Sequence, residues 1–138
     1  RYFGGDITRS IGTAFADAVL KYRGFSLYGE TMYRHADNPV VDAANRLFVL
    51  TGYGALVQAG YFLNDRLEVV TRAATVRPAA AVEALSREQT QVTLGINRYL
   101  NHHRVKVQAD VTWNQETDRS TATTEQNWLG RFQIELGI

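Results

Sequence analysis

The 138-residue sequence contains no cysteine, so it has neither a disulfide framework nor thiolate chemistry. Its 15 basic and 14 acidic side chains give a formal net charge of +1. The basic excess that is typical of nucleic-acid binders is therefore missing, and we expect no nucleic-acid partner. No apolar run approaches the roughly 20 residues that a membrane helix needs. A bilayer-spanning protein without such helices must be a closed β-barrel.

Alternation of polar and apolar residues is present along most of the chain and predicts strands. It is clearest at the end, where Trp128, Phe132 and Leu136 share one face and Arg131 and Glu135 the other. We predict strands at about residues 13–23, 25–35, 52–63, 67–77, 91–97, 105–113 and 128–138. Residues 14–22 also fit a helical stripe that stops at Gly24. We prefer the strand because the next segment alternates and needs a hairpin partner.

The predicted connections alternate in length. Short turns are expected at residues 23–24, 64–66 and 101–103, and longer loops at 36–51, 78–89 and 114–127, with a short helix over 79–88. This alternation is typical of outer-membrane barrels, which have tight periplasmic turns and long outer loops. The prediction is therefore an all-β, antiparallel transmembrane barrel, with residues 1–12 in an outer loop or at the end of a preceding strand.

The expected strand number indicates that more chain precedes these strands. Seven strands were found, whereas single-chain bacterial barrels have an even number of at least eight. The chain also begins at Arg1 with neither Met nor a signal peptide, so we expect a trimmed form or a piece of a larger protein. Residues 1–138 are thus interpreted as the C-terminal portion of one larger barrel domain.

A single register for the last hairpin brings complementary side chains together. Pairing Trp113 with Trp128 places Asp110 opposite Arg131 and also aligns Lys106 with Glu135, as stable cross-strand pairs require. In the first hairpin, a two-residue turn at Arg23 and Gly24 pairs Tyr22 with Phe25. It also sets Asp17 opposite Glu30, which a water-filled lumen tolerates, or which a cation such as Arg34 or Arg72 can bridge.

Three features favour lipid against the apolar face. Its rows are thin and rich in Ala, Gly and Thr, which fill a tight core poorly. The last predicted strand runs to Ile138 without a polar tail. Aromatic side chains fall near strand ends, as girdles do; the predicted girdle consists of Tyr22, Phe25, Tyr33, Tyr61, Trp113 and Trp128. A soluble barrel with a small apolar ligand would show the same alternation and stays an alternative.

The charged residues of the polar face are the functional candidates, because rings of charge set the ion preference of a pore. The same charges can simply hold the wall together through opposite signs on neighbouring strands. Since acids and bases are balanced, we expect little ion preference from this segment. The predicted pore-lining residues are Asp17, Lys21, Glu30, Arg34, Glu68, Arg72, Lys106, Asp110, Arg131 and Glu135.

Nothing in the sequence predicts catalysis, a metal or a cofactor. His102 and His103 are neighbours that point to opposite faces of a strand, and His35 belongs to the other end of the barrel, so they make a poor metal site. Asp17 and Glu30 lack the apolar pocket that would raise the pKa of a catalytic acid. No nucleophile elbow, zinc-protease, phosphate-loop or dinucleotide motif is present.

Four segments resemble the phosphate-selective porin family (the O and P porins): KYRGFSLYGE (21–30), VQAGYFLNDRLEVVTR (57–72), LGINRYLNHHRVKVQADVTW (94–113) and WLGRFQIELGI (128–138). The resemblance extends from about Gly12 to the end. It implies a large single-chain barrel of sixteen strands, usually a homotrimer, that passes small ions through the outer membrane. The sequence departs from the family at Ile138, where Phe is common. No phosphate-binding residue is carried over, because the constriction of that family lies largely outside this stretch.

Three functions fit these observations. The first is a passive porin in the bacterial outer membrane that contacts lipid and lipopolysaccharide and passes small ions and solutes, including anions such as phosphate. The second is a barrel that anchors or presents a partner through its outer loops. The third is a soluble β-barrel that binds a ligand. A need for detergent separates the third from the others, and conductance separates the first from the second.

Overall fold

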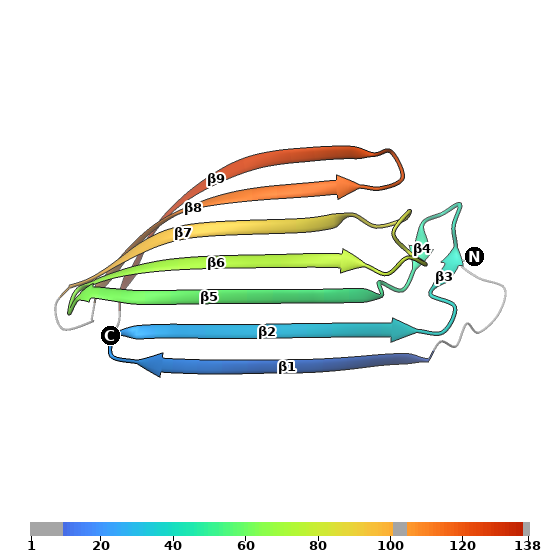
Figure 1. Cartoon of the computed structure of the whole chain (residues 1–138). Helices are drawn as coiled ribbons and strands as arrows, with labels where there is room; N and C mark the ends of the chain where they lie inside the picture. Colours follow the sequence, from blue (N-terminus) through green and yellow to red (C-terminus); the bar gives the residue numbers. More distant parts are fainter. Residues whose placement is uncertain (1–9, 101–104, 137–138) are drawn as a thin grey trace.

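The computed structural model describes residues 10–100 and 105–136, and these residues form an all-β protein without a helix (Figure 1). Seven long strands make one antiparallel sheet in the order β1-β2-β5-β6-β7-β8-β9, and β3 and β4 form a separate small hairpin. The strands are β1 (Ile11–Tyr22), β2 (Phe25–Ala36), β3 (Val40–Asp42), β4 (Leu47–Phe48), β5 (Gly52–Asn64), β6 (Leu67–Pro78), β7 (Glu88–Leu100), β8 (Val105–Asp118) and β9 (Thr123–Leu136).

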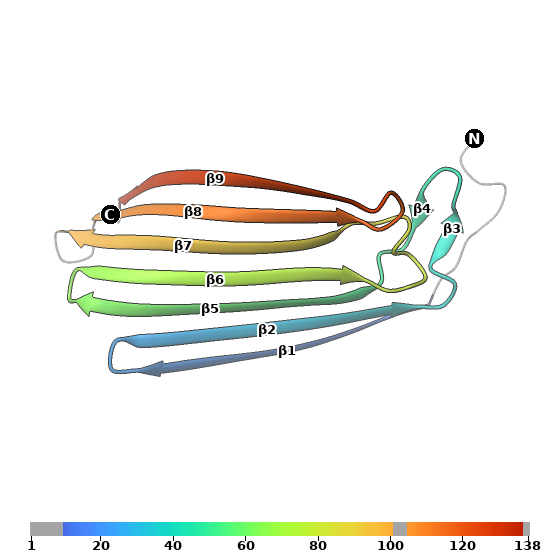
Figure 2. The ribbon, with the colours of Figure 1, turned by 45° about the horizontal axis from the view of Figure 1, so that its top comes forward.

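The two ends of the sheet differ, as Figure 2 shows: short turns lie at one end, and the β3–β4 hairpin and the other loops lie at the opposite end. The β1–β2 turn is possible because Arg23 (φ 46°) and Gly24 (φ 82°) both adopt the left-handed region, which a two-residue hairpin turn requires. At the β5–β6 turn, the backbone N–H of Arg66 donates to Asn64 Oδ1 at 3.0 Å. The turn expected at residues 101–103 lies outside the described residues.

The predicted registers of the first and last hairpins are confirmed. Trp113 is opposite Trp128, Asp110 is opposite Arg131, and Lys106 is opposite Glu135. In the first hairpin, Tyr22 faces Phe25 and Asp17 faces Glu30. The helical alternative for residues 14–22 is wrong, since this segment lies within β1. That strand begins two residues earlier than expected, at Ile11, while residues 1–9 lie outside the described part of the chain.

The predicted loop over residues 114–127 is wrong. β8 continues to Asp118 and β9 begins at Thr123, so only residues 119–122 connect them. Matching polar side chains face each other along the extension, and they hydrogen-bond across it: Asn114 donates to Asn127 at 2.9 Å and Gln126 to Gln115 at 3.3 Å. The polar residues of these two strand ends had been interpreted as a loop. The connection between β8 and β9 is short, so the expected alternation of short and long connections fails here.

The two other outer connections also differ from expectation. Residues 80–85 form turns instead of the helix expected over 79–88, and Glu88 already belongs to β7. Two of the backbone hydrogen bonds here, from Val82 to Ala79 and from Leu85 to Val82, span three residues, and one, from Ser86 to Val82, spans four. The loop over residues 36–51 contains the β3–β4 hairpin, in which Asp42 accepts hydrogen bonds from the backbone N–H groups of Ala44 and Asn45. Strand β7 is longer than the predicted 91–97.

The sheet carries almost no apolar core. Among the described residues, the only buried hydrophobic side chains are Ala36 and Val82, and both lie at the loop end of the sheet. Strands β1 and β9 are each paired on one side only, so the described sheet is open rather than closed into a barrel. A search of the described residues finds no helix suited to cross a membrane.

Candidate functional site

The ten charged residues singled out in the sequence all lie on one face of the sheet, which we call the polar face. Residues that are directly opposed share a face, and positions alternate along each strand. One row of opposed residues crosses all seven strands from Lys21 to Arg131 by way of Gly60, Val70 and Asp110. The ten are Asp17 and Lys21 in β1, Glu30 and Arg34 in β2, Glu68 and Arg72 in β6, Lys106 and Asp110 in β8, and Arg131 and Glu135 in β9.

The polar face is hollowed over strands β5 to β9. A depression of about 520 Å³ is lined by side chains of this face, including Gln58, Glu68, Arg72 and Asp110. Asp110 is 7% exposed, and Thr112 on the same face is 5% exposed. The opposite, apolar face is open: its exposed large side chains include Leu94, Phe132 and Trp128, at 62%, 68% and 73%. Polar groups are therefore sheltered and apolar groups exposed, the reverse of a soluble protein.

Two ion pairs join β8 to β9 on the polar face. Arg131 Nε lies 3.0 Å from Asp110 Oδ2, which also accepts a hydrogen bond from Gln108 Nε2 at 3.2 Å. Lys106 Nζ lies 3.9 Å from Glu135 Oε2, a looser contact. Both pairs were expected from the sequence. They support the reading in which these charges hold the wall together.

Glu68 has neutral partners instead of a cation. Its Oε2 accepts hydrogen bonds from Asn97 Nδ2 at 3.0 Å and from the Tyr99 hydroxyl at 2.8 Å. The Tyr99 ring stacks on Phe62 with the ring centroids 5.7 Å apart. Sequence reasoning missed Asn97, Tyr99 and Phe62, because β6 and β7 were never placed in register and neutral residues were not weighed.

No ion pair within the described part of the chain involves Asp17, Lys21, Glu30, Arg34 or Arg72. Asp17 and Glu30 face each other, yet neither Arg34 nor Arg72 bridges them, contrary to the option raised from the sequence. Instead the Tyr28 hydroxyl donates to Glu30 Oε2 at 2.7 Å, and Arg34 Nε donates to Thr13 at 3.3 Å. Like charges in this position are tolerable when water reaches them.

A ladder of neutral side chains crosses the same face, and the sequence analysis missed it. Gln91 Nε2 donates to Asn114 Oδ1 at 2.8 Å, and Asn114 in turn donates to Asn127. Two residues further along the strands, on the same face, the hydroxyls of Thr93 and Thr112 lie 2.9 Å apart. The signal was available, since amides and hydroxyls recur at alternate positions in β7, β8 and β9.

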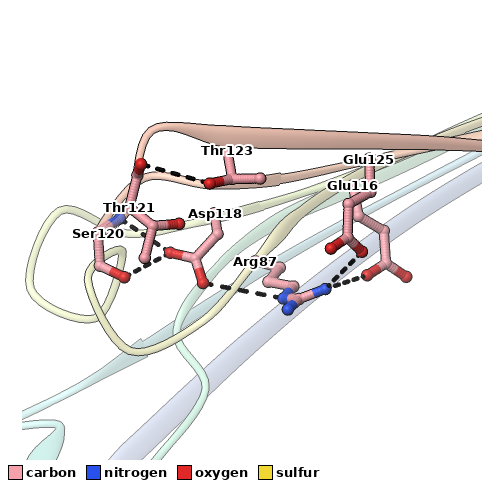
Figure 3. Close-up of polar contacts among 7 residues, drawn as sticks. All are labelled: Arg87, Glu116, Asp118, Ser120, Thr121, Thr123 and Glu125. Carbon is pink, nitrogen blue, oxygen red and sulfur yellow. Dashed lines mark hydrogen bonds and ion pairs between the residues drawn. The ribbon is translucent and has the colours of Figure 1, made fainter.

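Arg87, in the β6–β7 connection, forms ion pairs with acidic residues at the tip of the last hairpin (Figure 3). Its Nη1 lies 3.1 Å from Glu116 and 3.2 Å from Glu125, and its Nε lies 3.9 Å from Asp118. The hydrogen bond to Glu116 and the charge of Glu125 raise the pKa of the Arg87 guanidinium above its usual value. Sequence reasoning assigned Arg87 to a loop and did not see the cluster.

The apolar face carries a band of large side chains. In β2 the band lies between Phe25, next to the turn, and Tyr33, an interval of nine residues, which is about 26 Å along a strand. Beyond Trp113 and Trp128 the face turns polar, with Gln115 and Gln126 next along the strands. In β5 the band runs from Tyr53 past Tyr61 to the exposed Leu63. In β8 and β9 it extends from Trp113 and Trp128 to Val105 and Leu136, where the described part of each strand ends.

This band crosses the rows of opposed residues obliquely. The row through Trp113, where the band ends in β8, reaches Val57 in β5, four residues inside Tyr53, where the band ends in β5. The loop-side edge of the band therefore shifts along the strands between β5 and β8, so the strands are inclined to the band.

The proposed girdle residues lie at the edges of this band. Tyr22, Phe25 and Tyr61 are neighbours in a single row next to the short turns. Tyr33 pairs with Tyr53, an additional aromatic that we had not singled out, near the loop end. Trp113 and Trp128 pair where the band ends in β8 and β9.

No group of three or more potential metal ligands occurs among the described residues. His102 and His103 lie outside them. Comparisons of the chain with protein-family models, with curated proteins and with solved structures gave no match.

Proposed function

We propose that this chain forms part of the wall of a bacterial outer-membrane porin, a passive water-filled channel for small ions and solutes. The observation that carries the proposal is the inverted distribution of side chains. Asp110, Thr112 and Asn97 are sheltered in the hollow of the polar face, while large apolar side chains cover the exposed opposite face. Lipid in contact with the apolar face and water in contact with the polar face would solvate both kinds of side chain.

The oblique apolar band supports the same proposal. Strands of a membrane barrel are tilted by about 35–45°, so a band parallel to the membrane must cross the rows of opposed residues at an angle. A nine-residue stretch is also what a tilted membrane strand needs. At such a tilt, the 26 Å of apolar strand corresponds to a band roughly 20 Å tall, slightly under the ~25 Å of known barrels.

Closure of the barrel requires further strands. β1 and β9 both run from the loop end to the short-turn end, so their open edges are parallel to each other. An antiparallel closure therefore needs an odd number of additional strands between them. The resemblance to the phosphate-selective porins suggests nine more strands in a sixteen-stranded single-chain barrel, assembled as a homotrimer in contact with lipid and lipopolysaccharide.

The channel that we propose has weak ion preference in this segment. The Asp110–Arg131 and Lys106–Glu135 pairs cancel locally, which leaves anions such as phosphate to be selected elsewhere in the barrel. The proposal assigns no catalytic step and no cofactor to the chain. A soluble ligand-binding barrel is disfavoured, because it would bury the face that carries Leu94, Phe132 and Trp128.

A matched pair of cysteine variants tests the pore. Gln91 lies on the polar face and its neighbour Val92 on the apolar face, and the natural chain offers no competing thiol. In planar bilayers, a charged, membrane-impermeant thiol reagent should reduce the conductance of the Gln91→Cys protein and leave the Val92→Cys protein unchanged. Equal effects on both variants, or no conductance from the unmodified protein, would refute the porin and favour an anchor or scaffold.

A further inference from the structure

The hollow of the polar face contains one positive and one negative side chain that form no ion pair with any residue that the structure describes. Arg72 makes no hydrogen bond or ion pair with any residue that the structure describes, and it lines the hollow. Glu68 lines it as well, and the residues that donate hydrogen bonds to it, Asn97 and Tyr99, are neutral. The remaining acid of the hollow, Asp110, is already paired with Arg131.

Val70 separates the two charges on β6 and also lines the hollow. Arg72 and Glu68 are four positions apart, which is about 13 Å between their Cα atoms. The row neighbours of Val70 in β5 and β7 are Gly60 and Gly95. A Cβ on Gly95 would lie 3.2 Å from the Cβ of Asp110, and a Cβ on Gly60 would lie 2.8 Å from Glu68 Oε1. The missing side chain of Gly95 therefore leaves space in the hollow, and that of Gly60 leaves room for the Glu68 carboxylate.

Neutral hydrogen-bonding groups surround each charge. Gln58 and Thr93 are directly opposite Arg72 on the neighbouring strands, and a guanidinium next to an amide and a hydroxyl suits a carboxylate. Glu68 is held by two donors at one oxygen, which leaves the other oxygen to accept from a ligand. The two charged ends are separated by a space that a solute several ångströms long can occupy.

We infer that this hollow is a binding site for small zwitterionic solutes that carry a carboxylate and an ammonium group, such as short peptides. The carboxylate binds at Arg72 with Gln58 and Thr93, and the ammonium group binds at Glu68. A dipeptide is about 7 Å long when extended, which, with the reach of the two side chains, suits the separation along β6. The inference rests on the proposed function only in that water fills the space above the polar face.

Three probes that differ in one charge each test the site. Glycylglycine carries both charges, N-acetylglycylglycine only the carboxylate, and glycylglycinamide only the ammonium group. Titration calorimetry of the full-length protein in detergent micelles, at neutral pH and low salt, measures their affinities. We expect glycylglycine to bind at least about tenfold more tightly than either analogue, which is the order expected of one charge-assisted hydrogen bond.

The variants assign each charge to its partner. With Arg72→Gln, glycylglycine and glycylglycinamide should bind equally; with Glu68→Gln, glycylglycine and N-acetylglycylglycine should bind equally. The control Arg46→Gln, between β3 and β4, should keep both differences. If Glu68→Gln does not fold, Gly60→Ala displaces the Glu68 carboxylate and should give the same result.

Several outcomes would overturn the site. Equal affinities of all three probes for the natural protein would do so, as would differences that persist in the variants. Tightest binding by N-acetylglycylglycine, lost with Arg72→Gln but not with Glu68→Gln, would reveal a plain anion site. Because calorimetry needs no ion flow, a failure of the site is distinguishable from a failure of the porin, which the cysteine pair detects.

Discussion

Asp110 is the most sheltered charge on the polar face, with a side chain that is 4% exposed. Its Oδ2 accepts hydrogen bonds from Arg131 on β9 and from Gln108 on β8, so donors on both strands of the hairpin stabilise the carboxylate. Lys106 and Glu135 form the other pair of this hairpin, but they are 3.9 Å apart and more exposed. A sheltered charge that loses its partner is costly, whereas an exposed ion pair contributes little.

The two pairs should therefore respond differently to neutralisation. Arg131→Gln removes the cation and leaves Gln108 as a donor to Asp110. We expect the free energy of unfolding to fall by about 1–2 kcal/mol, discounted because Arg131 itself is 57% exposed. Lys106→Gln should cost about 0.5 kcal/mol or less. Urea unfolding in lipid vesicles measures both values. Equal losses would contradict the role assigned to Asp110.

At the scale of elements, the β8–β9 hairpin extends beyond the apolar band as a polar tip. Glu116 and Glu125 are directly opposed there, and like charges in that position destabilise a strand pair. Arg87 lies within 3.2 Å of both carboxylates and links the β6–β7 connection to the tip (Figure 3). The connection and the hairpin are therefore expected to be ordered together.

Removal of the Arg87 ion pairs should make the tip of the β8–β9 hairpin less ordered. In the Arg87→Gln variant the two carboxylates repel without compensation, so we expect faster amide hydrogen exchange over residues 116–125 and unchanged exchange in β5 and β6. Adding Glu125→Gln removes the repulsion and should slow the exchange again, while Arg46→Gln serves as a control. Unchanged protection in Arg87→Gln would show that cross-strand hydrogen bonds alone order the tip.

For the whole molecule, the decisive feature is that one face carries a band of exposed large apolar side chains, interrupted in β7 by Arg98. Both tryptophans of the chain, Trp113 and Trp128, lie on it. In the proposed membrane setting they are in contact with lipid at one edge of the band. Their fluorescence therefore reports on the surroundings of this face without any label.

Tryptophan emission from the protein in vesicles of brominated phosphatidylcholine should be strongly quenched relative to ordinary vesicles. A matched variant has both tryptophans replaced by Phe and carries Gln108→Trp, which places the only indole on the polar face. Its emission should resist brominated lipid and respond to acrylamide in water. The opposite pattern would mean that the apolar face packs against protein.

Local pattern alone was sufficient for much of the fold. Alternation in residues 105–113 and 128–136 determined the faces, and the charges of Asp110, Lys106, Arg131 and Glu135 selected the register, because a shift by one residue would exchange the faces. The positions of the candidate pore-lining residues on one face follow from the same rule. The polar tip of β8 and β9 was lost, since polar residues in strands and in loops look alike.

The amino-acid sequence by itself determined the seven long strands, their order along the chain and which side chains share a face, because these depend on a period of two between neighbours. Only the tertiary structure decided which face is hollow, that Glu68 binds neutral partners while Asp110 pairs with a cation, and that Arg87 reaches the tip of the last hairpin. These features depend on curvature and on contacts between residues far apart in the chain, which no local pattern encodes.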